Sequence, residues 1–198
     1  TGVHDSLWAK AMILEQGKDK FAFVFCDLIG LTVEVSANAR LQASEKTGIP
    51  VKNILIAAAH SHTGPLFYGF QHTYFHNRAL AANKGQDPHE RIDYTRYLNR
   101  QIVAATVKVN GGTHPVQLVA GVVEQKGLSF NRRYYMKHGP VLFNPGPLNP
   151  DIAGPAGAID PAVGILMLRD GRSQKYEGGV AIFAMHADCI GGTENSAD

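Results

Sequence analysis

The chain has 198 residues, of which 44% are hydrophobic and 18% are charged, so it can bury the core of one domain and lacks the composition of a disordered protein. Its Lys and Arg residues are scattered and its formal net charge is +2. This argues against a basic surface that binds nucleic acid and against a polybasic segment that binds membranes. No apolar run reaches the ~18 residues of a membrane-spanning helix.

The first residues predict a hairpin of two strands. Residues 8–14 and 21–27 are apolar runs, and the short connection between them contains Gly17 and Asp19. Glycine and aspartate in so short a connection are typical of a tight turn between antiparallel strands.

A helix and a third strand should follow this hairpin. Thr32 or Ser36 can cap a helix that ends at Gly48, because glycine readily adopts the left-handed conformation at a helix end. Residues 53–59 form a short apolar run, which suits a strand buried on both faces. Strand, helix and strand in this order predict a right-handed parallel crossover. The buried side of the helix is expected to consist of Val35, Ala39 and Ala43.

The middle of the chain predicts an aromatic loop, a helix and a strand. Residues 64–88 show no steady periodicity but many aromatic side chains, so we expect a functional loop that walls an apolar cleft. Residues 94–109 place apolar side chains at three- and four-residue spacing, which predicts a helix. Residues 116–123 predict a further strand.

The last part of the sequence favours hairpins. Residues 139–161 are dense in Gly and Pro, which indicates a stiff, ordered loop or a long excursion over the surface. The runs 163–168 and 179–185 should pair across Asp170-Gly-Arg172, because Asp-Gly is a hairpin signal. The predicted class is α/β, more specifically mixed α+β, with a mixed parallel and antiparallel sheet flanked by helices.

Three apolar runs stop at a side chain that can bind a metal. The runs that end near residues 59, 185 and 26 are followed directly by His60, His186 and Asp27. Ligands gather beyond the carboxyl ends of strands in open α/β sheets, so we expect these side chains at one edge. Imidazole is a common zinc ligand, and a catalytic zinc takes three protein ligands and an open position. The sequence therefore predicts a zinc site that contains His60 and His186.

Further side chains could complete this site. His62 lies two residues after His60, so both imidazoles point to one face if the strand continues through them. Asp27 and Asp188 could bind the ion or orient an imidazole. For Asp27 the alternative is ordinary hydrogen bonding at the end of a strand.

Other polar residues carry weaker signals. Asn131 and Arg132 precede the Gly- and Pro-rich segment. An arginine offers hydrogen-bond donors of fixed geometry to a carbonyl, carboxylate or phosphate, so Arg132 could bind substrate. The alternative is that Arg132 is simply solvated. Two cysteines, Cys26 and Cys189, are too few for a disulfide framework, and we expect both to be buried thiols. The alternative is that one of them is a ligand of the metal. We assign no role to the remaining histidines, which are His4, His72, His76, His89, His114 and His138.

Five motifs resemble, in order, those of the neutral (non-lysosomal) ceramidases. Ala59-His60-Ser-His62-Thr-Gly-Pro65 resembles the His-Thr-His-Ser-Gly-Pro signature of that family. The other four motifs are Gly2-Val-His-Asp5 with Leu7-Trp-Ala-Lys-Ala11, Phe25-Cys-Asp27-Leu-Ile-Gly30, Asn131-Arg132 and Phe183-Ala-Met-His186. They span nearly the whole chain. The sequence after His186 and the Gly- and Pro-rich loop differ from the animal enzymes, so a bacterial ceramidase-like relative is the better match.

The resemblance implies a zinc-dependent amidase that splits ceramide into a fatty acid and sphingosine. It implies that His60 and His186 bind Zn2+, that His62 is a further active-site residue and that Arg132 contacts substrate. Our own second catalytic candidate is Asp27, from its place at the end of a strand, and we group Asn131 with Arg132 as substrate-binding. In that family a glutamate and a tyrosine from later in the chain complete the zinc sphere. We therefore expect residues 1–198 to be the N-terminal part of a ceramidase-like catalytic domain, completed by the same polypeptide or by a second chain.

Two alternatives stay open at this point. One is a metal-dependent hydrolase of the same fold that acts on another amide or ester, and the other is a catalytically silent binding domain. The resemblance also implies a ceramide-like lipid amide as partner, peripheral membrane contact for access to it, no nucleic acid, and a secreted or periplasmic location.

Overall fold

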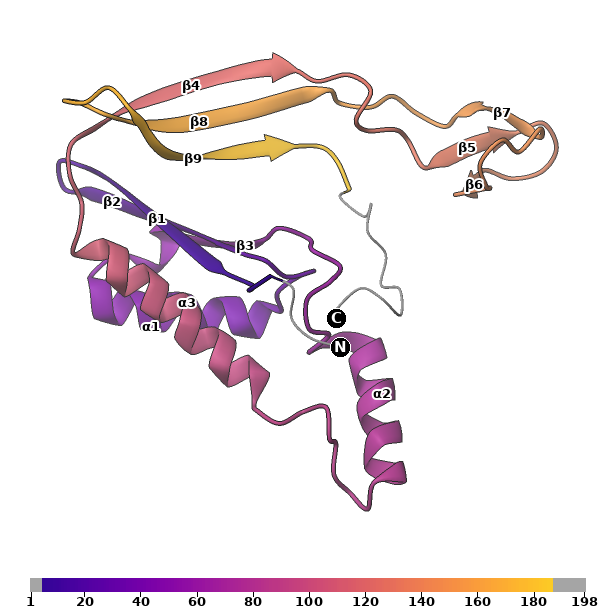
Figure 1. Ribbon diagram of the computed structural model, residues 1–198, viewed down its shortest axis with the longest axis horizontal. Coiled ribbons are helices and arrows are strands. Elements are labelled where there is room, and N and C mark those ends of the chain that lie inside the picture. The colour runs from indigo at the N-terminus through magenta and orange to yellow at the C-terminus, as the bar shows by residue number, and fades with distance from the viewer. Residues whose placement is uncertain (1–4, 187–198) are drawn as a thin grey trace. The chain divides into compact units, whose positions relative to one another are not determined.

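The computed structural model describes residues 5–186, which form two compact units (Figure 1). Unit 1 contains the described residues up to Thr113, and unit 2 runs from His114 to His186. The described residues form three α-helices and three sheets of three strands, an α+β arrangement without a closed barrel. The predicted class is confirmed, although the strands belong to three sheets rather than to one.

The sheet of unit 1 has the order β1-β2-β3, from β1 (Ala9–Gln16), β2 (Asp19–Cys26) and β3 (Ile54–Ala58). β1 and β2 are antiparallel and form the predicted hairpin. β3 pairs with β2 in parallel, from Ala22 opposite Ile54 to Cys26 opposite Ala58. The helix α1 (Val33–Thr47) joins these two strands, so the predicted crossover is confirmed.

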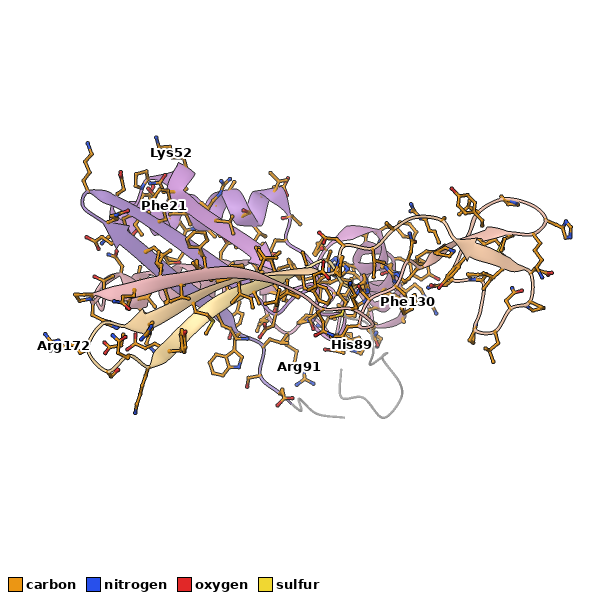
Figure 2. All side chains as sticks on the ribbon, turned by 90° about the horizontal axis from the view of Figure 1, so that it is seen from above. Phe21, Lys52, His89, Arg91, Phe130 and Arg172 are labelled. Atoms are coloured by element: carbon orange, nitrogen blue, oxygen red, sulfur yellow. The ribbon has the colours of Figure 1, made fainter. Side chains whose placement is uncertain are left out.

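The core of unit 1 lies between this sheet and two helices. Successive side chains of a strand point to opposite faces, so Ala22, Val24 and Cys26 share one face of β2, and all three are buried. α1 and α3 (Tyr94–Asn110) cover this face, and the figure shows both helices along the same side of the sheet (Figure 1). On the other face Phe21, which is marked in Figure 2, stays 45% exposed.

The helix α1 begins and ends as the sequence predicts. The Thr32 hydroxyl accepts a hydrogen bond from the backbone N–H of Val35 at 3.2 Å, which satisfies one of the unpaired donors of the first turn. Gly48 adopts φ of 74° and donates its N–H to the carbonyl of Ser44. The predicted buried side is confirmed in full, since Val35, Ala39 and Ala43 are the buried residues of this helix.

The segment that we expected to be a loop contains a helix instead. α2 (Gly69–Ala82) lies within residues 64–88 and buries none of its side chains. Periodic apolar residues predict a helix only when one face packs against a core, and α2 has no such face. The apolar periodicity that predicts a helix is therefore absent from the sequence of α2. A short 3-10 turn (Val51–Asn53) leads into β3.

The larger sheet of unit 2 consists of long antiparallel strands. Its order is β4-β8-β9, from β4 (Val116–Glu124), β8 (Ala162–Asp170) and β9 (Tyr176–Phe183). The predicted hairpin across Asp170 is confirmed, and its carboxylate accepts the backbone N–H groups of Arg172 and Ser173. Arg172 marks this turn in Figure 2.

The Gly- and Pro-rich region contributes a second, small sheet. β5 (Arg133–Met136) lies between β6 (Leu142–Phe143) and β7 (Ile152–Pro155), so residues 139–161, which we expected to form a loop, contain two strands. Unit 2 contributes none of the buried hydrophobic residues among those described. In the part of the chain that the structure describes, no helix has the length and apolar character to cross a bilayer.

We predict that Ile102→Ala destabilises unit 1 by about 2–5 kcal/mol, because Ile102 is fully buried on α3 and truncation leaves a cavity. Urea denaturation measures the change. Val107→Ala on the same helix is the matched control, since Val107 is 40% exposed, and a similar loss in both variants would contradict this account of the core.

We also predict an unreactive thiol at the end of β2. Burial raises the pKa of Cys26 from 9.0 to about 11, and the neighbouring Asp27 carboxylate adds to this effect. The folded protein therefore keeps the thiol proton where the unfolded chain begins to lose it, so stability falls as the pH rises from about 9 to 11. In a Cys189→Ser background, a thiol reagent at pH 8 should label Cys26 only after urea is added. Rapid labelling of the native protein would contradict the prediction.

Candidate functional site

The end of β3 places His60 on a loop that lies along the end of β2. The backbone N–H of Ala59 donates to the Cys26 carbonyl at 2.9 Å, and that of Ser61 donates to the Leu28 carbonyl at 3.2 Å. These bonds continue the parallel pairing beyond the strand. They fix the backbone on both sides of His60.

His60 itself has an unusual backbone conformation. Its φ is 62°, in the left-handed region, which costs about 1–3 kcal/mol for a residue other than glycine. Such a conformation persists only where the surroundings fix it, and the two flanking hydrogen bonds do so here. β3 ends at Ala58, so the strand does not continue through His60 and His62, and the condition for their sharing one strand face is not met.

The turn nevertheless brings the two imidazoles together. The ring centroids of His60 and His62 lie 4.9 Å apart at an interplanar angle of 85°, and they offer ring nitrogens within 4.8 Å of each other. Both side chains are exposed. Two imidazoles from one short loop can thus contribute to the same cation.

A hydrogen bond to the backbone selects the tautomer of His60. Its Nδ1 lies 2.8 Å from the carbonyl oxygen of Ile29, and a carbonyl can only accept, so Nδ1 carries the proton. The lone pair of the neutral ring is then on Nε2. A metal-binding histidine commonly donates its other ring N–H to a carbonyl or carboxylate, which orients the ring. The contact with Ile29 therefore suits the predicted role of His60 as a ligand.

Glycines allow this close packing. A Cβ on Gly30 would lie 2.1 Å from the hydroxyl oxygen of Tyr68, and one on Gly64 would lie 3.3 Å from the carbonyl oxygen of Asp27. A side chain at position 30 would displace the Tyr68 hydroxyl, and one at position 64 would require the backbone at Asp27 to shift by a few tenths of an ångström.

Asp27 takes part in strand-end hydrogen bonding. Its Oδ2 accepts the backbone N–H of Trp8 at 3.0 Å, and Lys10 Nζ lies 3.3 Å from its Oδ1. Its own N–H donates to the Trp8 carbonyl. These contacts join the start of β1 to the end of β2, which is the alternative that the sequence left open for Asp27. A catalytic role for it stays a prediction.

A groove of about 610 Å³ lies beside Asp27 within unit 1. Its lining is largely apolar and comes from the start of β1, the end of β2 and α3. None of the aromatic residues of the 64–88 segment lines this groove. On α2 the side chains of Phe70, Tyr74 and Phe75 are all exposed, and the Tyr74 ring contacts both phenylalanine rings, so the three form an exposed aromatic surface. Phe70 and Phe75 are 84% and 57% exposed.

The other predicted site residues belong to unit 2. Asn131 Oδ1 accepts the backbone N–H of Arg133 at 2.9 Å, and its Nδ2 donates to the Gly157 carbonyl at 3.1 Å. The Arg132 guanidinium carbon lies 5.0 Å from the centre of the Phe143 ring, a cation–π contact. Asn131 therefore fixes the loop that presents Arg132. Their contact with substrate stays a prediction.

His186 is half-buried and follows β9, as predicted. A hydrogen bond from the Met185 N–H to the Phe183 carbonyl turns the chain just before it. Because His186 belongs to unit 2, the shared ion with His60 stays a prediction. The candidates Asp188 and Cys189 lie outside the described residues.

One group of polar side chains was missed by sequence reasoning. His72 and His76 lie four residues apart on α2, and both contact carboxylates from the segment that follows the helix, Asp87 and Glu90. The backbone N–H of His89, and then the His76 imidazole, hold the pKa of Asp87 below its usual value. The spacing of the two histidines was visible in the sequence, but it indicates a shared face only if the segment is helical.

Comparison with known proteins agrees with the resemblance seen in the motifs. No protein family model matches the chain. The curated neutral ceramidase of Pseudomonas aeruginosa is 26% identical over 192 residues, which cover 94% of this chain and 26% of that protein. The predicted likeness to a ceramidase is therefore confirmed at a distant level.

Solved structures support the fold. The crystal structure of neutral ceramidase from Pseudomonas aeruginosa matches with a TM-score of 0.60 and 22% identity, over 92% of this chain. A ceramidase complexed with C2 matches with a TM-score of 0.56 and 21% identity. The chain spans 26% of the length of each of these relatives. In sequence and in fold, it is thus similar to about one quarter of a neutral ceramidase.

Proposed function

We propose that this chain supplies part of the active site of a zinc-dependent amide hydrolase that acts on ceramide-like lipids. The observation that carries the proposal is the likeness to neutral ceramidase over 94% of the chain, with His60 held by Ile29 in the tautomer that suits a ligand. In this proposal His60 and His186 hold the ion, and residues outside this chain complete its coordination.

The donor set fits zinc. Imidazole nitrogen is a common zinc ligand, and a ring with Nδ1–H bonded to a carbonyl presents Nε2 to the metal. When bound, Zn2+ supplies Lewis acidity that polarises an amide carbonyl and a water of lowered pKa.

The residues of this chain then have distinct tasks. In this proposal His62, whose ring meets that of His60 edge to face, accepts a proton on a ring nitrogen or delivers one to the leaving amine. Asp27 is the second candidate for proton transfer, and it keeps the end of β2 in register with Trp8. Arg132, presented by the loop that Asn131 fixes, would donate to the oxygen of the amide or of a head group.

The apolar half of the substrate fits the exposed aromatic surface of α2. Phe70 and Phe75 are large apolar side chains that lie open to solvent, and such surfaces commonly mark binding or membrane contact. We propose that they contact acyl chains at a lipid surface, which accords with a secreted or periplasmic enzyme that draws its substrate from a membrane.

Two other functions are separable by experiment. A hydrolase of another amide or ester would keep the metal requirement but prefer peptidoglycan fragments or simple esters to N-acyl lipids. A silent binding domain would bind lipid and hydrolyse nothing.

We predict that His60→Ala and His186→Ala in the full-length polypeptide each remove bound zinc and lower ceramide turnover by more than about 100-fold. Loss of a residue that merely supports a ligand already costs about 10–100-fold. Metal analysis and an amide-hydrolysis assay measure both effects, with His138→Ala as control. Unchanged zinc and unchanged turnover in both variants would refute the proposed site.

We predict that Phe70→Ser with Phe75→Ser raises the KM for ceramide in vesicles by about 10-fold or more, because two apolar anchors are lost. Hydrolysis of a short-chain, water-soluble amide should not change. The control is Leu148→Ser, since Leu148 is 99% exposed on unit 2. Equal effects on both substrates would count against lipid contact by α2.

A further inference from the structure

A cluster of four side chains joins α2 to the segment that follows it. The α2 cluster consists of His72, His76, Asp87 and Glu90. The two histidines are four residues apart, so they share a face of the helix, and their rings stack with centroids 5.8 Å apart and an interplanar angle of 15°.

The chain after α2 turns back to bring two carboxylates onto this face. The N–H of Gly85 donates to the Leu80 carbonyl at 2.8 Å, and Asp87 accepts the N–H of His89 on its Oδ1 at 2.9 Å. A further backbone bond, from the Glu90 N–H to the Asp87 carbonyl, closes a turn. His89 and Arg91, on either side of Glu90, are marked in Figure 2.

The ligand atoms of the cluster converge. His76 Nδ1 lies 3.0 Å from Asp87 Oδ2 and 3.2 Å from Glu90 Oε2. The other oxygen of Glu90, Oε1, contacts His72 Nε2. Glu90 therefore spans both imidazoles, and His76 meets both carboxylates. The atoms offered by His76, Asp87 and Glu90 all lie within 4.8 Å of one another.

Acidic groups are concentrated here. Two carboxylates face two imidazoles. In the described residues, the ion pairs of Asp87 and Glu90 run to His72 and His76 alone. The Asp87 side chain is only 8% exposed, although a carboxylate is costly to bury without full compensation.

The helix that carries the cluster has little else to hold it. α2 has 14 residues, buries none of them and has no side-chain cap at its start. Isolated helices of this length are marginal in water, since helix stability in proteins comes mostly from a packed face. The contacts of the α2 cluster are therefore a main restraint between the helix and residues 83–93.

We propose that the α2 cluster is a structural zinc site, separate from the candidate site at His60. Three of its ligands would be His76 Nδ1 and one oxygen each from Asp87 and Glu90, whose ligand atoms converge. The fourth would be His72 Nε2, which contacts the other Glu90 oxygen and would move toward the ion when it binds. Two ligands about 2.0–2.1 Å from a tetrahedral ion lie about 3.3–3.4 Å apart, close to the separations between His76 and its two carboxylates. The divalent charge would neutralise the two carboxylates.

The types of ligand atom in the α2 cluster favour zinc over calcium and magnesium. Two imidazole nitrogens and two carboxylate oxygens suit Zn2+, whereas Ca2+ and Mg2+ prefer oxygen ligands alone. Another cluster of this kind, His114 with Asp170 and Glu177 in unit 2, offers one imidazole, and its Asp170 already accepts two backbone N–H groups in the hairpin turn. That cluster therefore serves as a comparison rather than as a second proposal.

The test separates this site from the catalytic proposal. The full-length protein with His60→Ala and His186→Ala is stripped with a chelator and titrated with Zn2+ alone, and bound metal is measured by elemental analysis. We expect one tightly bound equivalent to remain. His76→Ala in that background should weaken its binding by at least about 10-fold, and Glu90→Gln, which preserves shape, should do the same.

Two controls make the result specific. His89→Ala changes a histidine in the same turn, and His114→Ala changes the comparison cluster, and neither should alter the retained equivalent. Substitution with Co2+ should give the visible spectrum of a tetrahedral site that the His76 variant lacks. Far-UV circular dichroism shows whether α2 persists. The proposal is overturned if the background protein retains no zinc, or if folded His76→Ala and Glu90→Gln proteins bind it as before.

Discussion

The burial of one face of β2 is the constraint on which the rest of unit 1 depends. Ala22, Val24 and Cys26 are enclosed by α1 and α3, so this strand has one position relative to the helices. β3 pairs with it in parallel register, and the same pairing continues past the strands through Ala59 and Ser61. The orientation of the His60 ring, set by the Ile29 carbonyl, is therefore a consequence of packing more than twenty residues earlier in the chain. Chemistry at this loop depends directly on the core.

Much of unit 1 could be predicted because local signals and tertiary packing agree there. The cap at Thr32, the stop at Gly48 and the buried positions of α1 follow from helix geometry and the residues present. α2 could not be predicted, because a helix without a buried face leaves no apolar period in the sequence. Without that helix, the spacing of His72 and His76 did not indicate a shared face. The carboxylates that reach them lie beyond the turn at residues 83–88, and the sequence does not show which side chains meet there. The His60 and His62 pair was expected from strand alternation, whereas a turn with positive φ brings the rings together.

The two histidine-containing regions of unit 1 illustrate different ways to place imidazoles. At the end of β3 a hydrogen bond from Nδ1 to a backbone carbonyl fixes the ring of His60 and leaves the lone pair on Nε2. On α2 the helical spacing fixes two rings, and carboxylates meet His76 at Nδ1 and His72 at Nε2. The first arrangement rests on a backbone carbonyl and the second on side-chain carboxylates, so carboxylate substitutions would alter only the second.

The buried hydrophobic residues of the described chain all lie in unit 1, which has a consequence for folding during synthesis. Every buried hydrophobic residue in the described chain lies before Thr113, while strands of unit 2 carry apolar side chains that stay open, such as Val122 at 70% and Ile182 at 73%. Chains emerge from the ribosome amino end first, and compact parts fold as they appear. Unit 1 can thus become structured while translation continues, whereas β4 and β9 expose apolar side chains when they are made. Transiently exposed apolar strands of this kind are prone to aggregate.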